Sequence, residues 1–451
     1  MRRFFIRYWM IWVLCACTGT LAAHSQTTAG LPEFETQRLL NGLEIIVAPT
    51  PGPDRSMTIG LVVRYGSAFD GANKSGVAHF LSQMFARATN DKTRDSIRTE
   101  LENIGATLQV QCNWDGFKFL MKGNSANFEQ SLLLLYQIVC ELQFPEEEMA
   151  AVKQEILQEL QQAPDPRNRL REMFEIVLFG GTTYGRTLKG TPETVQSITT
   201  GDLKYYYERH FSPNAASLVL AGNVDPSRVL EKASRIWGLW IRKEPIPFTF
   251  APAREPAADI HLIKDAPGSS AVEFILGNFS PRRQDPVFGY VRLATYILQQ
   301  RLRELLPTSL VSTGLDGRRM PGIVYVQGQA AAGDSVDQIL EIEALLERMK
   351  MEPVSSVELA EAQNRIIEEF IGKLKTTDGL CEIMLDTELY RLGTYYIASF
   401  PDRIRNCTAD SIRQAARDYL LPGKKVVILQ GPVQELLPEL KRLGTFKQIA
   451  P

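Results

Sequence analysis

The chain has 451 residues, of which 44% are hydrophobic and 23% are charged. A chain of this length is expected to form roughly two to four compact units, and both fractions are ordinary for a soluble globular protein. The formal net charge is only −2 and no basic cluster stands out, which argues against binding of nucleic acid or of an anionic membrane surface.

Residues 1–25 have the pattern of a secretory signal peptide. Three arginines within the first seven residues precede an apolar run over residues 9–23, and small residues follow. A run of about 15 apolar residues is short for a bilayer span, so a cleaved signal is favoured over a membrane anchor. Lipidation at Cys17 is an alternative, because residues 14–17 resemble a bacterial lipobox. The sequence therefore predicts an exported protein, periplasmic or associated with the outer membrane, that contacts a membrane only if Cys17 is acylated.

The cysteines beyond this segment do not predict a metal or redox motif. They are Cys112, Cys140, Cys381 and Cys407. No two of them form a CxxC pair, and their wide spacing specifies no disulfide even in an oxidising compartment. Each is therefore expected to be a small buried apolar residue.

Apolar runs predict strands, and apolar residues repeated every three to four positions predict helices, along the whole chain. The predicted strands are residues 43–47, 58–63, 117–121, 216–220, 272–276, 323–327 and 425–429. The predicted helices are residues 75–88, 95–104, 127–142, 146–161, 287–304, 335–350 and 356–375. Hairpin-like pairs of strands next to long helices favour an α+β fold over a parallel doubly wound sheet.

The predicted helix at residues 75–88 contains the order His79-Phe-Leu-Ser82-Gln83. It resembles the inverted zinc-peptidase motif H-x-x-E-H, as the insulinase/pitrilysin family (M16) carries it after a similar strand. In that motif the two histidines share one helix face and hold Zn²⁺, and the glutamate polarises the metal-bound water. Here Ser82 replaces the base and Gln83 replaces the second histidine, and neither side chain supplies the same chemistry.

The predicted helix at residues 146–161 resembles the family's helix that supplies a third zinc ligand, a distant glutamate. Glu148 and Glu155 are seven residues apart, so they lie on one helix face two turns apart. The resemblance implies Glu155 as the ligand position and Glu148 as a supporting residue. Taken alone, the residues also fit a solvated acidic helix face, because Glu146 and Glu147 are adjacent.

Two segments of the chain repeat each other. Residues 200–224 and 408–433 each contain an N-capping residue, a helix, a proline turn and an apolar strand. The proline and the glycine that flank the strand are nine residues apart in both segments, over residues 213–222 and 422–431. Matching order at matching ends of two halves indicates a duplication.

A proline-rich stretch divides the two halves and predicts an extended linker, because proline lacks an N–H group and disfavours helix. The expected organisation is a signal peptide, a first domain over residues 26–243 with the vestigial metal site, a linker over 244–260, and a second domain over 261–451. The family resemblance implies the same layout: two similar domains, each a mostly antiparallel sheet covered by helices.

The second half resembles a family segment in which an arginine precedes a substrate-binding tyrosine by seven residues. Arg303 matches the arginine, but the seventh residue after it is Leu310. The Tyr184-Gly-Arg186 loop extends the resemblance, which covers roughly residues 39–432.

The resemblance implies a function without intact chemistry. Half-length members of the family commonly pair, one chain supplying the metal site and its mate supplying substrate contacts. The chain is therefore interpreted as a non-catalytic partner of an intact M16 peptidase subunit, or as a subunit that binds unfolded or extended peptides. No cofactor is expected, and zinc is the ion if any binds. Two alternatives stay open: an active zinc metalloendopeptidase with an atypical site, and a scaffold protein independent of any peptidase.

Overall fold

The computed structural model of the protein describes residues 33–50, 52, 54–162, 165–393, 395–421 and 424–449. The predicted signal peptide and the lipidation site at Cys17 lie outside these residues. Within them, no helix is both long enough and apolar enough to cross a membrane.

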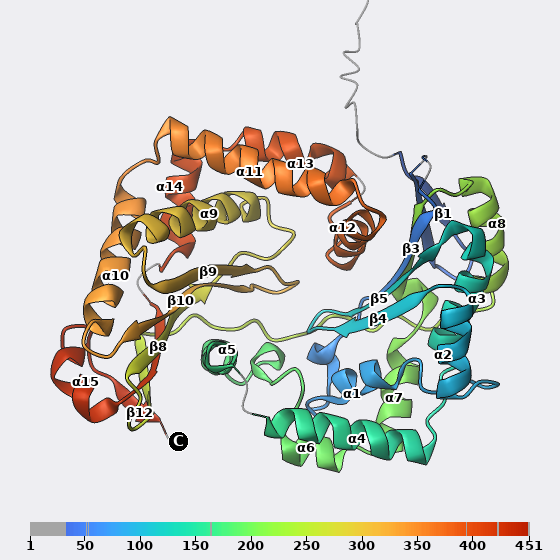
Figure 1. Cartoon of the computed structure of the whole chain (residues 1–451), viewed down its shortest axis with the longest axis horizontal. Coiled ribbons are helices and arrows are strands. Elements are labelled where there is room, and N and C mark those ends of the chain that lie inside the picture. Colours follow the sequence, from blue (N-terminus) through green and yellow to red (C-terminus); the bar gives the residue numbers. More distant parts are fainter. Residues whose placement is uncertain are drawn as a thin grey trace, which may run out of the picture. The chain divides into compact units, whose positions relative to one another are not determined.

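Six strands of the described chain form a first sheet, in the order β1-β2-β6-β3-β5-β4 (Figure 1). They are β1 (Glu35–Arg38), β2 (Glu44–Pro49), β3 (Ser56–Val63), β4 (Thr107–Cys112), β5 (Phe117–Asn124) and β6 (Ala216–Gly222). β2 and β6 run parallel, and the other neighbours run antiparallel. Every residue of β6 and nearly every residue of β3 is buried, as expected of strands covered on both faces.

A second sheet has the order β12-β7-β11-β8-β10-β9. Its strands are β7 (Ile260–Asp265), β8 (Ala271–Phe279), β9 (Leu310–Asp316), β10 (Ile323–Ala331), β11 (Val426–Gly431) and β12 (Lys447–Ile449). From β2 and β7 onward the two sheets match strand for strand, including the parallel pair β7–β11 and the antiparallel pairs that follow. This correspondence confirms the internal repeat and the α+β fold predicted from the sequence.

Helices surround both sheets. They are α1 (Val77–Met84), α2 (Arg94–Asn103), α3 (Phe128–Cys140), α4 (Glu146–Gln161), α5 (Pro166–Phe179), α6 (Pro192–Ser197), α7 (Thr200–His210), α8 (Pro226–Trp237), α9 (Phe288–Leu305), α10 (Ser335–Met351), α11 (Ser356–Leu374), α12 (Thr377–Leu389), α13 (Tyr395–Arg405), α14 (Ala409–Tyr419) and α15 (Val433–Leu440). The repeated helices α7 and α14 both begin at a threonine capping box, at Thr199 and Thr408.

The helix predicted at residues 75–88 is shorter in the structure, because α1 ends at Met84. Phe85 has an extended backbone, and Ala86 has a φ of 65°, in the left-handed region. A helix of L-residues does not continue through such a conformation. The chain therefore turns sharply at Ala86, and this turn directs the following residue, Arg87, toward α4.

Each sheet is also covered by a helix from the opposite half of the sequence. α5 packs against β8 and β11 of the second sheet, and α12 packs against β3 and β6 of the first sheet (Figure 1). Residues 241–259, around the predicted linker, form no helix or strand. The strands before the predicted linker thus form the first sheet and those after it form the second, whereas α5 and α12 each pack on the sheet of the other half.

Buried charge joins the two halves. Arg318 is only 2% exposed, and its Nη2 donates to Glu175 Oε2 and to Asp316 Oδ2, both at 2.7 Å. Its guanidinium also lies 3.9 Å from the ring centroid of Trp114. The neighbouring backbone N–H of Arg319 donates to the carboxylate of Asp115 at 3.1 Å. Since Asp115 and Glu175 belong to the first half of the sequence, these bonds tie the β9–β10 turn to it.

The close docking of α12 on β3 requires a glycine at position 60. A Cβ at Gly60 would lie 2.6 Å from Cys381 Sγ and 2.9 Å from a methyl of Leu385. We expect Gly60→Ala to lower the free energy of unfolding by about 1–3 kcal/mol, because overpacking forces neighbouring side chains to shift. Urea denaturation followed by circular dichroism measures the change.

Gly123→Ala on β5 is the matched control. Its Cβ would meet the nearest atom only at 3.4 Å, so a substantially smaller loss is expected. Equal losses for the two variants would contradict the tight contact between α12 and β3.

Candidate functional site

The N-terminus of α1 is held by a buried carboxylate. Asp70 accepts hydrogen bonds from the backbone N–H groups of Gly76 (2.8 Å) and Ala78 (3.0 Å). Burial raises the pKa of Asp70 to about 7, although these N–H groups oppose the shift. Asp70 therefore satisfies two of the N–H groups that the first turn of a helix leaves without partners.

The loop at residues 184–190 packs directly against this helix start. Arg186 Nη1 donates to the backbone oxygen of Asp70 at 2.7 Å. A Cβ at Gly76 would lie 2.6 Å from the backbone oxygen of Lys189. A Cβ at Gly190 would lie 2.5 Å from the backbone oxygen of Ser75, just before α1. Both glycines have positive φ, at 95° and 81°. The loop singled out in the sequence thus positions α1.

His79 lies on α1 with its side chain 12% exposed. Its Nε2 is buried without a hydrogen-bond partner among the described residues, and it lies 4.0 Å from Oε2 of Glu159 on α4. Burial lowers the pKa of His79 to about 4, although Glu159 opposes the shift. The imidazole is therefore neutral near pH 7, with one unprotonated ring nitrogen. Glu159 is shared, because its other oxygen forms an ion pair with Lys189.

Glu155 does not face His79 in this structure. Arg87 Nη2 binds Glu155 Oε2 at 2.6 Å, and Arg87 Nη1 lies 3.5 Å from Glu148 Oε2. The sequence-based assignment chose Glu155 of α4, whereas the structure places Glu159 of the same helix opposite His79. Residues four apart share one helix face, so spacing within α4 does not distinguish Glu155 from Glu159. The role of Arg87 has no motif in the sequence and depends on the turn after α1.

The two positions that depart from the motif do not complete a metal site. Ser82 Oγ donates to the backbone oxygen of His79 at 2.6 Å, and the side chain of Gln83 is exposed. In the described part of the chain, no group of three His, Cys, Asp or Glu side chains is placed to hold a metal ion. His79 and Glu159 are two donors, one short of the three protein ligands of a typical catalytic zinc. The residues present therefore do not fit such a zinc site.

The predicted substrate-binding pair, Arg303 and Leu310, lies at the surface. Arg303 is exposed near the end of α9 and forms no ion pair within the described residues. Leu310, the first residue of the edge strand β9, is 58% exposed. An aliphatic side chain donates no hydrogen bond, so only Arg303 of this pair is able to contact a peptide carbonyl.

Comparison with known proteins identifies the family. Residues 46–192 match the family described as insulinase (peptidase family M16), and residues 197–366 match the peptidase M16 inactive domain. The chain belongs to peptidase family M16.

Relatives of this M16 chain carry zinc-protease and processing-peptidase names. An uncharacterized zinc protease of Rickettsia bellii is 28% identical over 233 residues, which is 51% of this chain and 56% of that protein. The chain thus spans only about half of the Rickettsia relative. A probable mitochondrial-processing peptidase subunit beta of Arabidopsis thaliana is 24% identical over 92% of this chain and 81% of that protein.

Solved structures share the M16 fold. The peptidase M16 inactive domain of Pseudomonas fluorescens has a TM-score of 0.82 at 20% identity, covering 89% of this chain and 98% of that one. The periplasmic protease PqqL of Escherichia coli has a TM-score of 0.77 at 13% identity, covering 94% of this chain and 49% of that one. At these identities the similarity establishes the fold alone.

Four cysteines lie among the described residues of this M16 chain, and all four are free: Cys112, Cys140, Cys381 and Cys407. Cys381 and Cys407 are buried, and the other two are half-buried. Burial raises the pKa of each thiol, so all four are protonated near pH 7.

The depressed pKa of His79 predicts a pH-dependent stability. Between pH 6.5 and about 4 the unfolded state binds a proton at His79 that the folded state does not, so stability falls as the pH drops through this window. The effect is at most about 3 kcal/mol. His79→Gln should flatten this part of the stability-versus-pH curve, measured by urea denaturation.

NMR titration of the imidazole gives an independent measurement. In the stability measurement, His210→Gln is the variant to compare with His79→Gln, because burial also lowers the pKa of His210 to about 4. A His79 that titrates near 6.5 would show that its ring is hydrated and that the neutral, buried state is wrong.

Proposed function

We propose that this chain is a catalytically degenerate M16 homologue that binds extended peptides as the non-catalytic subunit of an exported M16 peptidase. The observation that carries the proposal is the occupancy of the α1–α4 interface. There Arg87 binds Glu148 and Glu155, and Glu159 is the one acidic side chain opposite His79 in the described part of the chain. The guanidinium of Arg87 is permanently charged and lies between two acidic side chains. A metal ion would favour the same position.

The chemistry at this interface supports a non-catalytic role. Ser82 uses its hydroxyl hydrogen in a bond to the α1 backbone, and a hydroxyl is not a base near neutral pH. Loss of general acid–base help alone costs about 10²–10⁴-fold in rate. The absence of a third metal ligand among the described residues adds to this loss.

An edge strand offers a place for an extended peptide. β4 pairs only with β5, and its residues alternate between exposed and half-buried. Gln109 and Gln111 of β4 also line a cavity of about 280 Å³ together with Lys118 and Asp386. A peptide that adds to such an edge gains main-chain hydrogen bonds, and neighbouring pockets select its side chains.

Family pairing and export complete the proposal. The Arabidopsis relative is by name a subunit, and residues 197–366 match a domain described as inactive. The apolar segment predicted as a signal peptide and the fold shared with a periplasmic protease support an exported location.

A repair experiment tests the placement of the acid opposite His79. We expect Ser82→Glu with Gln83→His to bind stoichiometric zinc, because the double variant adds a second histidine one helical turn from His79. Adding Glu159→Gln should abolish the binding, whereas adding Glu155→Gln should preserve it. Metal content after dialysis against zinc measures each variant.

The reverse result, with zinc lost in the Glu155→Gln background and kept in the Glu159→Gln background, would favour the sequence-based assignment over the geometry. Stoichiometric zinc in the unmodified chain, together with peptide cleavage that a chelator blocks, would contradict the proposed function. It would support the active zinc endopeptidase instead.

Assembly is the second test. We expect a one-to-one complex with an intact M16 chain from the same compartment, burying more than about 1,000 Å² in total. The complex should bind peptide more tightly than the partner alone, and kcat should change less than KM. Size-exclusion chromatography with light scattering and peptidase assays measure both effects.

The control is the partner assayed without this chain. Separate elution of the two chains at micromolar concentration, with equal cleavage by the partner alone, would remove the subunit proposal and leave the scaffold alternative.

A further inference from the structure

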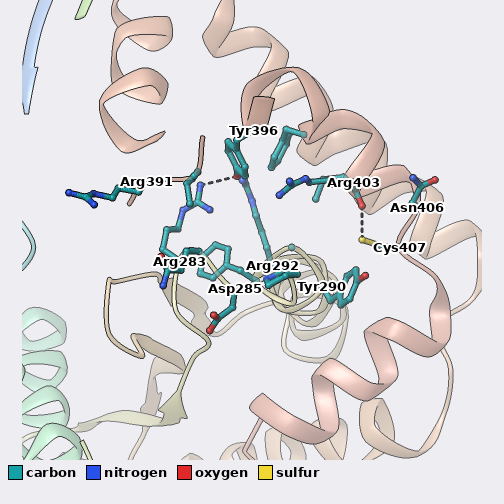
Figure 2. A pocket seen from close by; sticks show the side chains of 16 residues that line it. Arg283, Asp285, Tyr290, Arg292, Arg391, Tyr396, Arg403, Asn406 and Cys407 are labelled. Carbon is teal, nitrogen blue, oxygen red and sulfur yellow. Dashed lines mark hydrogen bonds between the residues drawn. The ribbon is translucent and has the colours of Figure 1, made fainter. Parts of the chain in front are cut away.

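A basic cavity of about 440 Å³ lies in the second half of the chain, between the start of α9, the turn after α12 and helix α13 (Figure 2). Its lining includes four arginines: Arg283, Arg292, Arg391 and Arg403. Asp285 is the single acidic residue among the described residues that line it. The cavity uses no residue of the α1–α4 interface.

The arginines of this cavity have no ion-pair partner among the described residues. Asp285, by contrast, pairs with Arg282 at 2.8 Å. Figure 2 shows the Asp285 carboxylate directed away from Tyr396, whereas Arg283, Arg292 and Arg403 lie around this tyrosine and the Arg391 side chain extends away from it. The nearby Glu369 is exposed and pairs with Arg365 at 3.1 Å.

Aromatic rings hold the guanidinium groups in place. The Arg283 guanidinium lies 4.8 Å from the Phe288 centroid and 5.2 Å from the Tyr396 centroid, and its Nη2 donates to the Tyr396 hydroxyl at 2.9 Å. Arg292 lies 5.4 Å from the Phe400 centroid, and Arg403 lies 5.6 Å from the Tyr396 centroid. Contact with an aromatic face orients a guanidinium but does not cancel its charge, and most of its N–H groups remain available to donate hydrogen bonds.

The four arginines stand at two depths. Arg283 and Arg292 are half-buried, whereas Arg391 and Arg403 are exposed. Burial and the positive charge of Arg283 lower the pKa of Arg292, partly offset by Tyr396 and Glu369. Arg391 has a φ of 50°, a left-handed conformation that is unfavourable for a residue with a side chain. Such strain often occurs at binding sites.

We propose that this cavity binds a small organic anion through its carboxylate or phosphate oxygens. Planar guanidinium groups donate paired hydrogen bonds to either kind of oxyanion. A volume of about 440 Å³ is within the range of small-molecule sites. Tyr290 and Phe400 would contact the carbon skeleton of the ligand, and the exposed Arg391 and Arg403 would meet it first at the entrance.

Calorimetry on the full chain tests the proposal with two separate probes, citrate for carboxylates and pyrophosphate for phosphates. At low salt we expect at least one of them to bind with a Kd below about 1 mM. The affinity should fall at least about tenfold in Arg292→Gln and in Arg403→Gln, because each removes a charged donor. Binding of citrate alone or pyrophosphate alone identifies the preferred oxyanion, and binding of both identifies a general oxyanion site.

Arg348→Gln is the matched control. Arg348 is an exposed arginine on α10 that forms no ion pair with a described residue and does not line the cavity, so its variant should bind as the wild type does. Circular dichroism verifies folding, and the exposed Arg403 supplies a variant that does not disturb the interior.

Three results would overturn the proposal. They are no binding of either anion near about 1 mM, binding that survives both cavity substitutions, and an equal loss in Arg348→Gln.

Discussion

Arg318 is buried where the two halves of the chain meet, and it binds Glu175 of α5 and Asp316 at the end of β9. Removing one member of a buried charge pair typically costs about 3–5 kcal/mol, because the remaining charge lacks a partner. Glu175 belongs to the first half of the sequence, yet α5 packs on the second sheet. This buried charge and the apolar face of α5 therefore hold α5 on the second sheet, and with it the path of the chain from α4 to the loop at residues 184–190.

The α1–α4 interface sits within that arrangement. Asp70 and the loop hold one end of α1, and Arg87 joins the region beyond its other end to α4. Under the proposed function, Arg87 links the segment after α1 to α4, as a metal ion bound between these two helices would. Glu155 is 49% exposed, so this ion pair contributes modestly to stability. The apolar packing of α1 and α4 supplies the remainder.

The internal repeat relates the two regions of interest. β3 and β8 occupy equivalent places in their sheets. The segment after β3 carries His79, and the segment after β8 carries Arg283 and Arg292. Duplication thus produced two similar frameworks with different side chains in matching places. The first has an imidazole facing a carboxylate, and the second has guanidinium groups without an ion-pair partner among the described residues. The fold is shared, and the chemistry is local to each half.

Local patterns in the sequence determined the strands at the centre of each sheet, the helix at residues 146–161, the repeat and the family. These features depend on hydrophobic periodicity and capping residues, which act over a few neighbouring positions. The strands β1, β4, β7, β9 and β12 were not predicted, because most of their residues are partly or fully exposed and give a weak apolar pattern. Only the tertiary structure decided that Glu159 rather than Glu155 faces His79, that Arg87 binds Glu155, and that four arginines share one cavity. Each of these depends on how distant segments pack together, and spacing along a single helix does not encode that.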